Sequence, residues 1–220
     1  MSILYSIGAG LARVTFRTFG RFTVTGKQNI PQEGPFIVVA NHLSNGDPPA
    51  VVAAIPRQLR IMAKRSLFAG PLLTRMWTSM GLYPLDREGR DVKALMWAIH
   101  TLKRGESMLL FPEGTRSRTG GLRKAKTGAA YVALKANVPI LPVGVTGTER
   151  ISSLLRVPFP FSHVRVNIGP SFRLPKPEGP VTQELLETLT EQIMVRIAAL
   201  LPEEYRGHYS TAVSQSGMSS

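Results

Sequence analysis

The chain contains no cysteine, which excludes disulfides, thiolate metal sites and a cysteine nucleophile. It also has no apolar run near the roughly 20 residues of a spanning helix, so no transmembrane segment is predicted. No basic region precedes the first apolar residues, which argues against a secretory signal. Acidic residues are scarce as well: 14 Asp and Glu face 27 Lys and Arg, giving a formal net charge of +13.

This excess of positive charge and the pI near 10.7 indicate an anionic partner, such as acidic lipid, nucleic acid or a phosphorylated ligand. A well-solvated basic surface is the alternative interpretation. Aromatic content of 7% and the absence of a helix-turn-helix or RNA-binding signature argue against nucleic acid. The length of 220 residues and hydrophobic content of 43% predict one domain with a sizeable core.

Short apolar runs alternate with segments of helical period along most of the chain. Strands are predicted at residues 36–40, 59–62, 82–85, 107–111, 140–145 and 164–168. Helices are predicted at residues 48–55, 68–80, 91–102, 128–137 and 182–200. This alternation predicts an α/β fold, with a mixed central sheet flanked by helices and ligands at the strand ends. Pro84 cannot donate to a ladder, so the strand at 82–85 is expected at a sheet edge.

Three regions are expected along the chain: an amphipathic helix at 1–21, the main domain at 22–202, and a flexible tail at 203–220 that is rich in Ser and Gly. The helix combines an apolar face with a basic stripe, which suits a helix lying on an anionic bilayer. The alternative is packing on the domain's own core with the arginines in water. The apolar face consists of Leu4, Ile7, Leu11 and Val14, and the basic stripe consists of Arg13, Arg17 and Arg21.

A second segment mixes cations with apolar residues and could add to a membrane-binding surface. Ordinary core is the alternative for its apolar members. The cations are Arg57, Arg60, Lys64, Arg65 and Arg75, and the apolar residues are Leu67, Phe68, Leu72 and Trp77.

His42 is followed five positions later by Asp47, where an apolar run breaks into a loop. This layout suits a histidine that acts as a general base while the acid holds its ring. A turn histidine that satisfies local backbone groups is the alternative. The chain has no Gly-x-Ser-x-Gly elbow, His-Glu-x-x-His or Gly-x-x-x-x-Gly-Lys motif, so no covalent nucleophile and no metal site is expected. The remaining mechanism is one in which His42 acts as a base and takes a proton from a substrate hydroxyl that attacks an electrophile directly.

A second cluster follows the strand at 107–111. Gly114 lets the backbone approach a ligand closely, and a guanidinium fork matches phosphate oxygens. Arg87 also follows a strand end, so Arg87 and Arg116 form a hypothetical phosphate clamp. The alternative is that each arginine pairs with a nearby acid, Asp86 or Glu113. The polar residues that follow Phe111 and could bind a ligand are Glu113, Thr115, Arg116 and Arg118.

Four segments together carry a family resemblance. They occur in the order and spacing of the four motifs of the glycerolipid acyltransferases, and the first and third together are highly specific. The chain resembles this family, in particular its bacterial 1-acylglycerol-3-phosphate acyltransferases, over residues 22–168. The segments are Asn41-His42-x-x-x-x-Asp47, Gly81-x-x-x-x-Asp86-Arg87, Phe111-Pro-Glu-Gly-Thr-Arg116 and Val138-Pro-Ile-Leu-Pro142.

The resemblance implies acyl transfer from acyl-carrier protein or acyl-coenzyme A to lysophosphatidic acid, giving phosphatidic acid, with no cofactor beyond the thioester co-substrate. It implies a peripheral or monotopic protein at the cytoplasmic face of the membrane, in contact with the anionic surface and not with nucleic acid. Another lyso-lipid or glycerol 3-phosphate as acceptor, or a non-catalytic basic module that binds anionic membrane or nucleic acid, are the alternatives. The implied roles are His42 as base, Asp47 as its partner, and Arg87, Glu113, Gly114, Thr115 and Arg116 as ligands of the glycerol phosphate.

Overall fold

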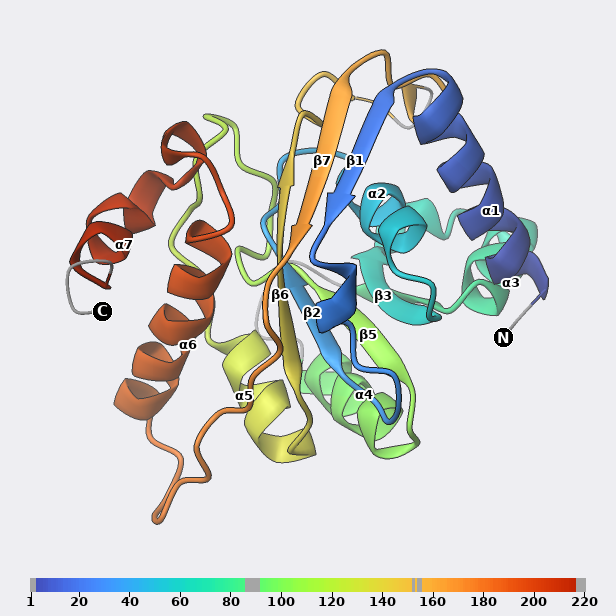
Figure 1. Cartoon of the computed structure of the whole chain (residues 1–220). Coiled ribbons are helices and arrows are strands. Elements are labelled where there is room, and N and C mark those ends of the chain that lie inside the picture. Colours follow the sequence, from blue (N-terminus) through green and yellow to red (C-terminus); the bar gives the residue numbers. More distant parts are fainter. Residues whose placement is uncertain (1–2, 86–91, 152, 154–155, 217–220) are drawn as a thin grey trace.

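A computed structural model of the chain describes residues 3–85, 92–151, 153 and 156–216 (Figure 1). Its centre is a seven-stranded sheet in the order β1-β7-β6-β2-β5-β3-β4. The strands are β1 (Arg21–Thr25), β2 (Ile37–Ala40), β3 (Leu59–Lys64), β4 (Leu82–Leu85), β5 (Ser107–Leu110), β6 (Ile140–Thr146) and β7 (His163–Ile168).

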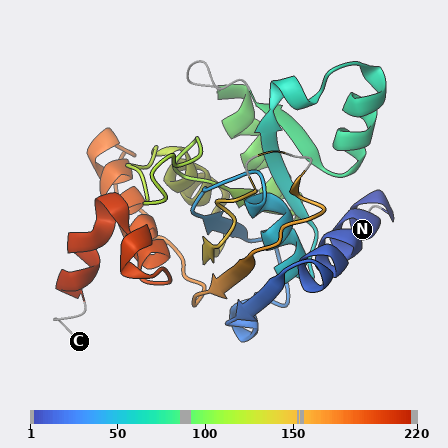
Figure 2. The same cartoon turned by 90° about the horizontal axis from the view of Figure 1, so that it is seen from above.

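Helices cover both faces of this sheet, as the sequence predicts for an α/β fold. In the view from above, α1 and the C-terminal helices lie on opposite sides of the sheet (Figure 2). Strand β2 shows why its sequence is apolar throughout: Val38 and Ala40 pack on the α1 and α2 side, and Ile37 and Val39 on the other. The helices are α1 (Ile3–Thr18), α2 (Asp47–Ala54), α3 (Pro71–Ser79), α4 (Val92–Lys103), α5 (Gly128–Ala136), α6 (Gln183–Ala198) and α7 (Ser210–Ser216).

The sheet is mixed, and its parallel part positions the site. Strands β6, β2, β5, β3 and β4 pair in parallel, whereas β7 is antiparallel to β6 and β1 is parallel to β7. The carboxyl ends of the five parallel strands therefore meet at one edge, and the loops that follow β2, β5 and β6 lie together there. Strand β4, which contains Pro84, is at the end of the order, so the predicted edge position is confirmed.

Strand β1 was not predicted from the sequence. Its five residues alternate between exposed and half-buried positions, and no position is fully buried. It pairs only with β7, with Arg21 opposite His163. An edge strand with arginine and threonine on its exposed side carries too weak an apolar signal to be found from the sequence.

Helix α1 packs on the domain through residues other than the predicted apolar row. Tyr5, Ala9 and Phe16 are buried. The Tyr5 hydroxyl accepts a hydrogen bond from the Leu59 amide at 3.0 Å, and Arg13 Nε donates to the Ala53 carbonyl at the end of α2 at 3.1 Å. The predicted row instead faces outward: Leu4, Ile7, Leu11 and Val14 are 46%, 60%, 65% and 60% exposed.

Part of the second basic segment belongs to the fold. Arg57 donates to the carbonyls of Pro31 and Gly34 and lies over the Phe36 ring. Arg60 forms an ion pair of 2.6 Å with Glu106. Both side chains therefore make contacts within the fold, and Glu106 offsets the charge of Arg60. Among the described residues, no helix is both long and apolar enough to cross a bilayer.

The prediction of a flexible tail from residue 203 was wrong as far as residue 216. This segment forms 3₁₀ turns at Glu203–Tyr205 and Gly207–Tyr209, followed by α7. Tyr209 is 2% exposed, and its hydroxyl accepts a hydrogen bond from the Ala125 amide at 3.0 Å. The Ser- and Gly-rich composition concealed two tyrosines, Tyr205 and Tyr209, that pack on the α6 side of the core.

Replacing Tyr209 tests whether this segment stabilises the domain. We expect Tyr209→Ala to lower the free energy of unfolding by about 3–5 kcal/mol, because it leaves a large cavity. Tyr209→Phe loses only the hydrogen bond and should cost about 1–3 kcal/mol. Urea unfolding measures both, with the exposed neighbour His208→Ala as the control. Equal stability of the Tyr209→Ala and His208→Ala proteins would show that the segment is loose.

Candidate functional site

His42 and Asp47 lie in contact at the carboxyl end of β2. His42 Nδ1 is 2.7 Å from Asp47 Oδ2, and Asp47 is fully buried at the first residue of α2. A carboxylate only accepts hydrogen bonds, so Nδ1 is the donor of this bond, and in a neutral ring the lone pair is then on Nε2. The Phe111 ring stacks on the imidazole, with 4.1 Å between ring centroids. The predicted pair of His42 and Asp47 is therefore formed.

The Asp47 carboxylate is held by further donors. Oδ2 also accepts from the amides of Leu43 at 2.6 Å and Ser44 at 2.7 Å. Oδ1 accepts from the hydroxyl of Thr148, a fully buried residue that follows β6. The dipole of α2 adds a favourable field at its N-terminus. Together these contacts fix the position of the carboxylate and, through it, the orientation of the His42 ring.

The sequence analysis did not identify Thr148 as a site residue, because it is 101 residues from Asp47 along the chain. The available signal was a pair of hydroxyl residues, Thr146 and Thr148, directly after an apolar strand. Hydroxyl groups at a strand end are common in loops, so this signal alone could not assign the contact.

Asn41 fastens the start of the same loop to the sheet. Its Nδ2 donates to the Val145 carbonyl at 2.8 Å, and its Oδ1 accepts from the Val145 amide at 2.7 Å. The side-chain amide thus takes the place of a peptide group and extends the β2–β6 ladder by one rung. The loop that carries His42 begins from a fixed point.

Glu113 occupies a different position from the one expected of a substrate ligand. It is 3% exposed; Oε1 accepts from the His42 amide at 2.8 Å and Oε2 from the Arg123 amide at 3.0 Å. Burial raises the pKa of Glu113 to about 7, although the two amides oppose this effect. Glu113 therefore joins the His42 backbone to the loop before α5, and its direct contact with substrate stays a prediction.

Three of the predicted residues, His42, Gly114 and Arg116, line a cavity of about 550 Å³. Gly114 has φ of 71°, and a Cβ atom there would lie 3.1 Å from the Lys126 side chain. The rest of the cavity lining is mainly apolar and comes from α2, β3 and the turn after it, α3, β4, β5 and the loop before β7. The apolar lining residues are Pro48, Pro49, Ile61, Met62, Ala63, Leu67, Trp77, Leu82, Leu85, Leu109, Leu110, Phe111, Val157 and Pro158.

The structure describes some of the other residues predicted to bind the phosphate. Thr115 is half-buried and Arg116 is exposed. Glu113 directs its oxygens to the backbone amides of His42 and Arg123, which does not favour the alternative in which Glu113 pairs with Arg116. Arg87 and Asp86 lie outside the described residues, so the second arginine of the clamp stays a prediction.

The raised pKa of Glu113 predicts a specific pH dependence of stability. Below pH 4.5 the carboxyl group is protonated whether the chain is folded or unfolded; as the pH rises to about 7, the unfolded chain ionises first and the folded state loses stability. We expect wild type to lose on the order of 3 kcal/mol more than Glu113→Gln between pH 4.5 and pH 8. Urea unfolding at both pH values measures this difference.

Glu113→Gln also leaves one amide without an acceptor, which lowers its stability at every pH by about 1–3 kcal/mol. The pH dependence is therefore the informative quantity. Glu184→Gln, an exposed position on α6, is the matched control and should follow wild type. A Glu113→Gln protein with the wild-type pH dependence would contradict the raised pKa.

Comparisons with known proteins agree with this geometry. The family profile described as Acyltransferase matches residues 21–146. A 1-acyl-sn-glycerol-3-phosphate acyltransferase of Borreliella burgdorferi is 34% identical over 131 residues, covering 59% of this chain and 52% of that protein. One of Bacillus subtilis is 26% identical over 198 residues, covering 90% of this chain and 96% of that protein.

A solved structure is also similar. The crystal structure of the 1-acyl-sn-glycerophosphate (LPA) acyltransferase PlsC from Thermotoga maritima matches with a TM-score of 0.69 and 30% identity, covering 90% of this chain and 78% of that one. The chain spans only 40–52% of the length of the first curated relatives. Because the family profile matches more than half of its residues, the chain belongs to the Acyltransferase family.

Proposed function

We propose that the chain transfers an acyl group from a thioester to the free hydroxyl of lysophosphatidic acid, which gives phosphatidic acid. The observation that carries this proposal is the His42–Asp47 pair at the wall of a mainly apolar cavity that Arg116 also lines. The activity named for the similar proteins supports the choice of acceptor. A basic module that only binds anions would not need a buried catalytic-type pair beside an apolar cavity.

His42 Nε2 would act as the general base. It takes the proton from the acceptor hydroxyl, whose oxygen attacks the thioester carbonyl carbon and forms a tetrahedral oxyanion. The oxyanion collapses, the carbon–sulfur bond breaks, and the imidazolium returns its proton to the departing sulfur. Such a base contributes about 10²–10⁴ in rate, and Asp47 stabilises the imidazolium as it forms. No acyl-enzyme is needed in this sequence of steps.

The cavity suits the acyl chains of such a reaction. Its lining is apolar apart from a few polar groups, which is typical of a pocket that binds a hydrocarbon and orients one reactive end. Residues from α3 and from the loop before β7 close it beside the sheet. Both acyl-carrier protein and acyl-coenzyme A fit this proposal as donors, because each delivers the same thioester.

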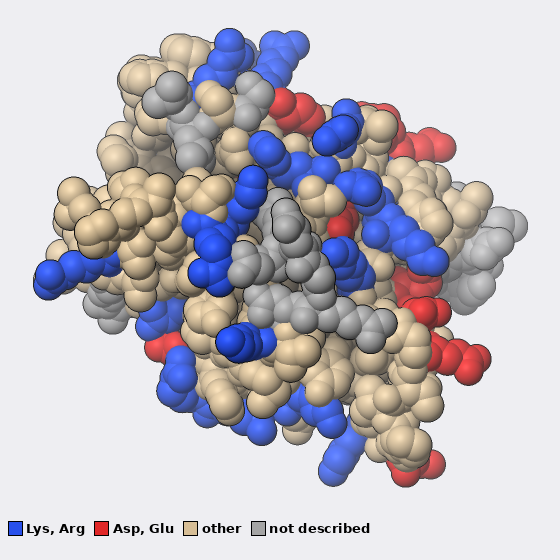
Figure 3. All heavy atoms as spheres, turned by 180° about the vertical axis from the view of Figure 1, so that it is seen from behind, with Lys and Arg blue, Asp and Glu red and all other residues tan. Residues whose placement is uncertain are grey.

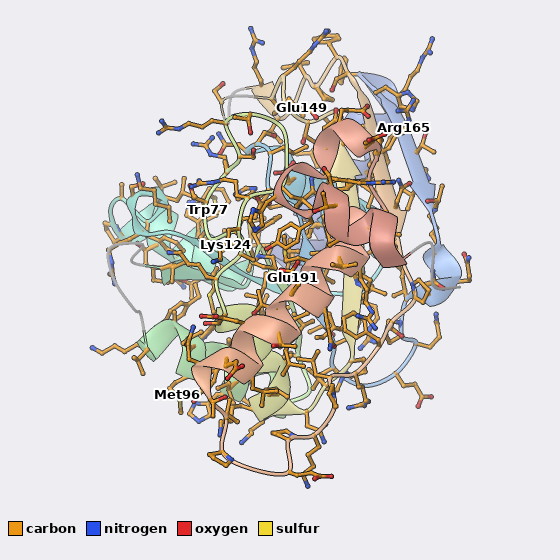
Figure 4. All side chains as sticks on the ribbon, turned by 90° about the vertical axis from the view of Figure 1, so that its left-hand side faces the viewer. Trp77, Met96, Lys124, Glu149, Arg165 and Glu191 are labelled. Atoms are coloured by element: carbon orange, nitrogen blue, oxygen red, sulfur yellow. The ribbon has the colours of Figure 1, made fainter. Side chains whose placement is uncertain are left out.

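The phosphate of the acceptor would bind at the loop after β5. Thr115 and Arg116 offer a hydroxyl and a guanidinium group beside Gly114, and no acidic residue occurs between positions 114 and 148. Figure 3 shows Lys and Arg gathered over the face seen from behind, with Asp and Glu mainly toward one side. The distribution of charge in Figure 3 favours an anionic ligand on the basic side. Figure 4 labels Lys124, which belongs to the loop before α5, and Glu191 of α6.

The amphiphilic substrates also require contact with a lipid surface. Helix α1 presents an exposed apolar row, and no acidic residue occurs before Glu33. A helix of this kind lies in the membrane interface. We therefore propose a peripheral or monotopic protein at the cytoplasmic face of the membrane. Another lyso-lipid or glycerol 3-phosphate is the alternative acceptor, because the residues at the site do not distinguish them.

Replacement of His42 tests the base. His42→Ala should lower the turnover number by about 10²–10⁴ or more, because no other group accepts the hydroxyl proton. The assay combines lysophosphatidic acid with each thioester and detects phosphatidic acid and free thiol by mass. His100→Ala, an exposed histidine on α4, is the matched control and should keep wild-type turnover. Near-normal turnover in a folded His42→Ala protein rejects the proposal.

Replacement of Arg116 tests the phosphate site. Arg116→Ala should raise the KM for lysophosphatidic acid by about 10–100-fold with a smaller change in kcat, because a hydrogen bond to a charged group is lost. Arg118→Ala removes the same charge from the same loop and is the control. An equal rise in KM for both proteins would mean that only the general positive field matters, and Arg116 would lose its assigned role.

A further inference from the structure

Three phenylalanine rings gather on the surface beside the end of α1. Phe19, Phe159 and Phe161, here called the Phe cluster, are 40%, 51% and 71% exposed. Their ring centroids are 5.0, 6.1 and 6.3 Å apart. A group of exposed aromatic rings marks a contact surface, because each ring left in water forgoes a favourable burial energy.

The backbone holds these rings outward. Phe161 has φ of 39°, in the left-handed region that residues other than glycine rarely adopt. Its amide donates to the Phe19 carbonyl at 3.0 Å, and the Arg21 amide donates to the Ser162 carbonyl at 3.2 Å. The loop at 156–161 is thus fastened to the end of α1, beside which it lies at the top of Figure 1. The same local conformation that strains Phe161 keeps its ring in solvent.

Helix α1 leads directly into the Phe cluster and carries its own exposed apolar row. These residues recur at helical spacing on the outer side of α1, so the apolar surface extends along the helix from its first turn to the rings. They are Ile3, Leu4, Ile7, Leu11 and Val14, with exposed fractions of 78%, 46%, 60%, 65% and 60%.

Charge identifies what covers this surface. Arg17, Arg21 and Arg156 are exposed near the cluster in sequence. No acidic residue occurs in residues 1–32 or 150–177. Aromatic rings and aliphatic side chains among arginines, with no carboxylates, are typical of a surface that enters an anionic bilayer, where each cation near the surface contributes about 1 kcal/mol. A second copy of the chain would instead bring like charges together.

The cluster is also continuous with the cavity. Val157 and Pro158, which immediately precede Phe159, line the cavity that contains His42 and Arg116. One side of the loop at 156–161 is therefore a wall of the cavity, and the next residues are the exposed rings. An amphiphile that moves from a bilayer toward His42 would pass this loop if the rings were in the lipid.

We propose that the Phe cluster inserts into an anionic bilayer and holds the cavity at the lipid surface, so that the loop at 156–161 passes the acceptor from the membrane to the site. The insertion is independent of the reaction, whereas the passage of the acceptor rests on the proposed function. The double variant Phe159→Ser/Phe161→Ser removes the two most exposed rings without replacing a residue that lines the cavity.

The first experiment measures flotation of the protein with vesicles of phosphatidylcholine and phosphatidylglycerol, without substrate. The double variant should bind at least about tenfold more weakly than wild type, because a phenylalanine side chain contributes at least this factor on burial. The control is Val92→Ser/Met96→Ser, which removes two exposed apolar residues of α4, on the other face of the sheet. The control should bind as wild type does.

The second experiment measures acyl transfer to a short-chain lysophosphatidic acid dissolved as monomers, and to a long-chain one held in the same vesicles. The double variant should keep the wild-type rate with monomers and lose about tenfold or more with vesicles. Equal loss with both acceptors would mean that the rings only support the cavity wall, and would overturn the proposal.

Four further outcomes are decisive. Vesicle binding that the double variant leaves unchanged rejects the Phe cluster as a lipid contact, whatever the activity. Equally tight binding of wild type to pure phosphatidylcholine rejects the preference for anionic lipid, and dimerisation of wild type that the double variant abolishes assigns the surface to a second copy. Ring-dependent vesicle binding by a wild type that transfers no acyl group keeps the lipid contact and rejects the proposed function instead.

Discussion

The buried carboxylate of Asp47 is the constraint on which the site depends. A buried carboxylate without hydrogen bonds is strongly unfavourable, and this one accepts from His42, from two neighbouring amides and from Thr148. These donors come from loops after two different strands, β2 and β6. Both loops must therefore adopt their native positions before the carboxylate can be buried with its hydrogen bonds formed. The orientation of the His42 ring follows from folding and needs no separate adjustment.

The parallel sheet makes this arrangement possible, because it brings the ends of β2, β5 and β6 to one edge. Three side chains then join these loops to backbone groups: Asn41 to β6, Asp47 to its own loop, and Glu113 to the His42 amide. Glu113 links the β5 loop, which carries the cations, to the β2 loop, which carries the imidazole. A shift of either loop would break a buried hydrogen bond, so the scaffold holds the backbones of the two loops at a fixed spacing.

The sequence was sufficient to predict features that depend on residues close together along the chain. Strands buried on both faces are continuous apolar runs, Pro84 marks an edge, and His42 and Asp47 are close enough along the chain for a turn to join them. It was insufficient where the partners are distant: the Glu113 bond to the His42 amide spans 71 residues. Composition also misled, because Ser and Gly after residue 203 hid the buried Tyr209.

The two sides of α1 differ, and the inner side packs close to the candidate site. Its inner side carries Tyr5, which is buried and bonded to the Leu59 amide of β3, and Arg13, which donates to the Ala53 carbonyl at the end of α2. Helix α2 begins at Asp47. The helix whose outer side is apolar is thus packed against the helix that begins with the acid of the His42 pair. Because packed interiors are dense and only slightly compressible, the orientation of α1 and that of α2, which begins at the wall of the cavity, are coupled.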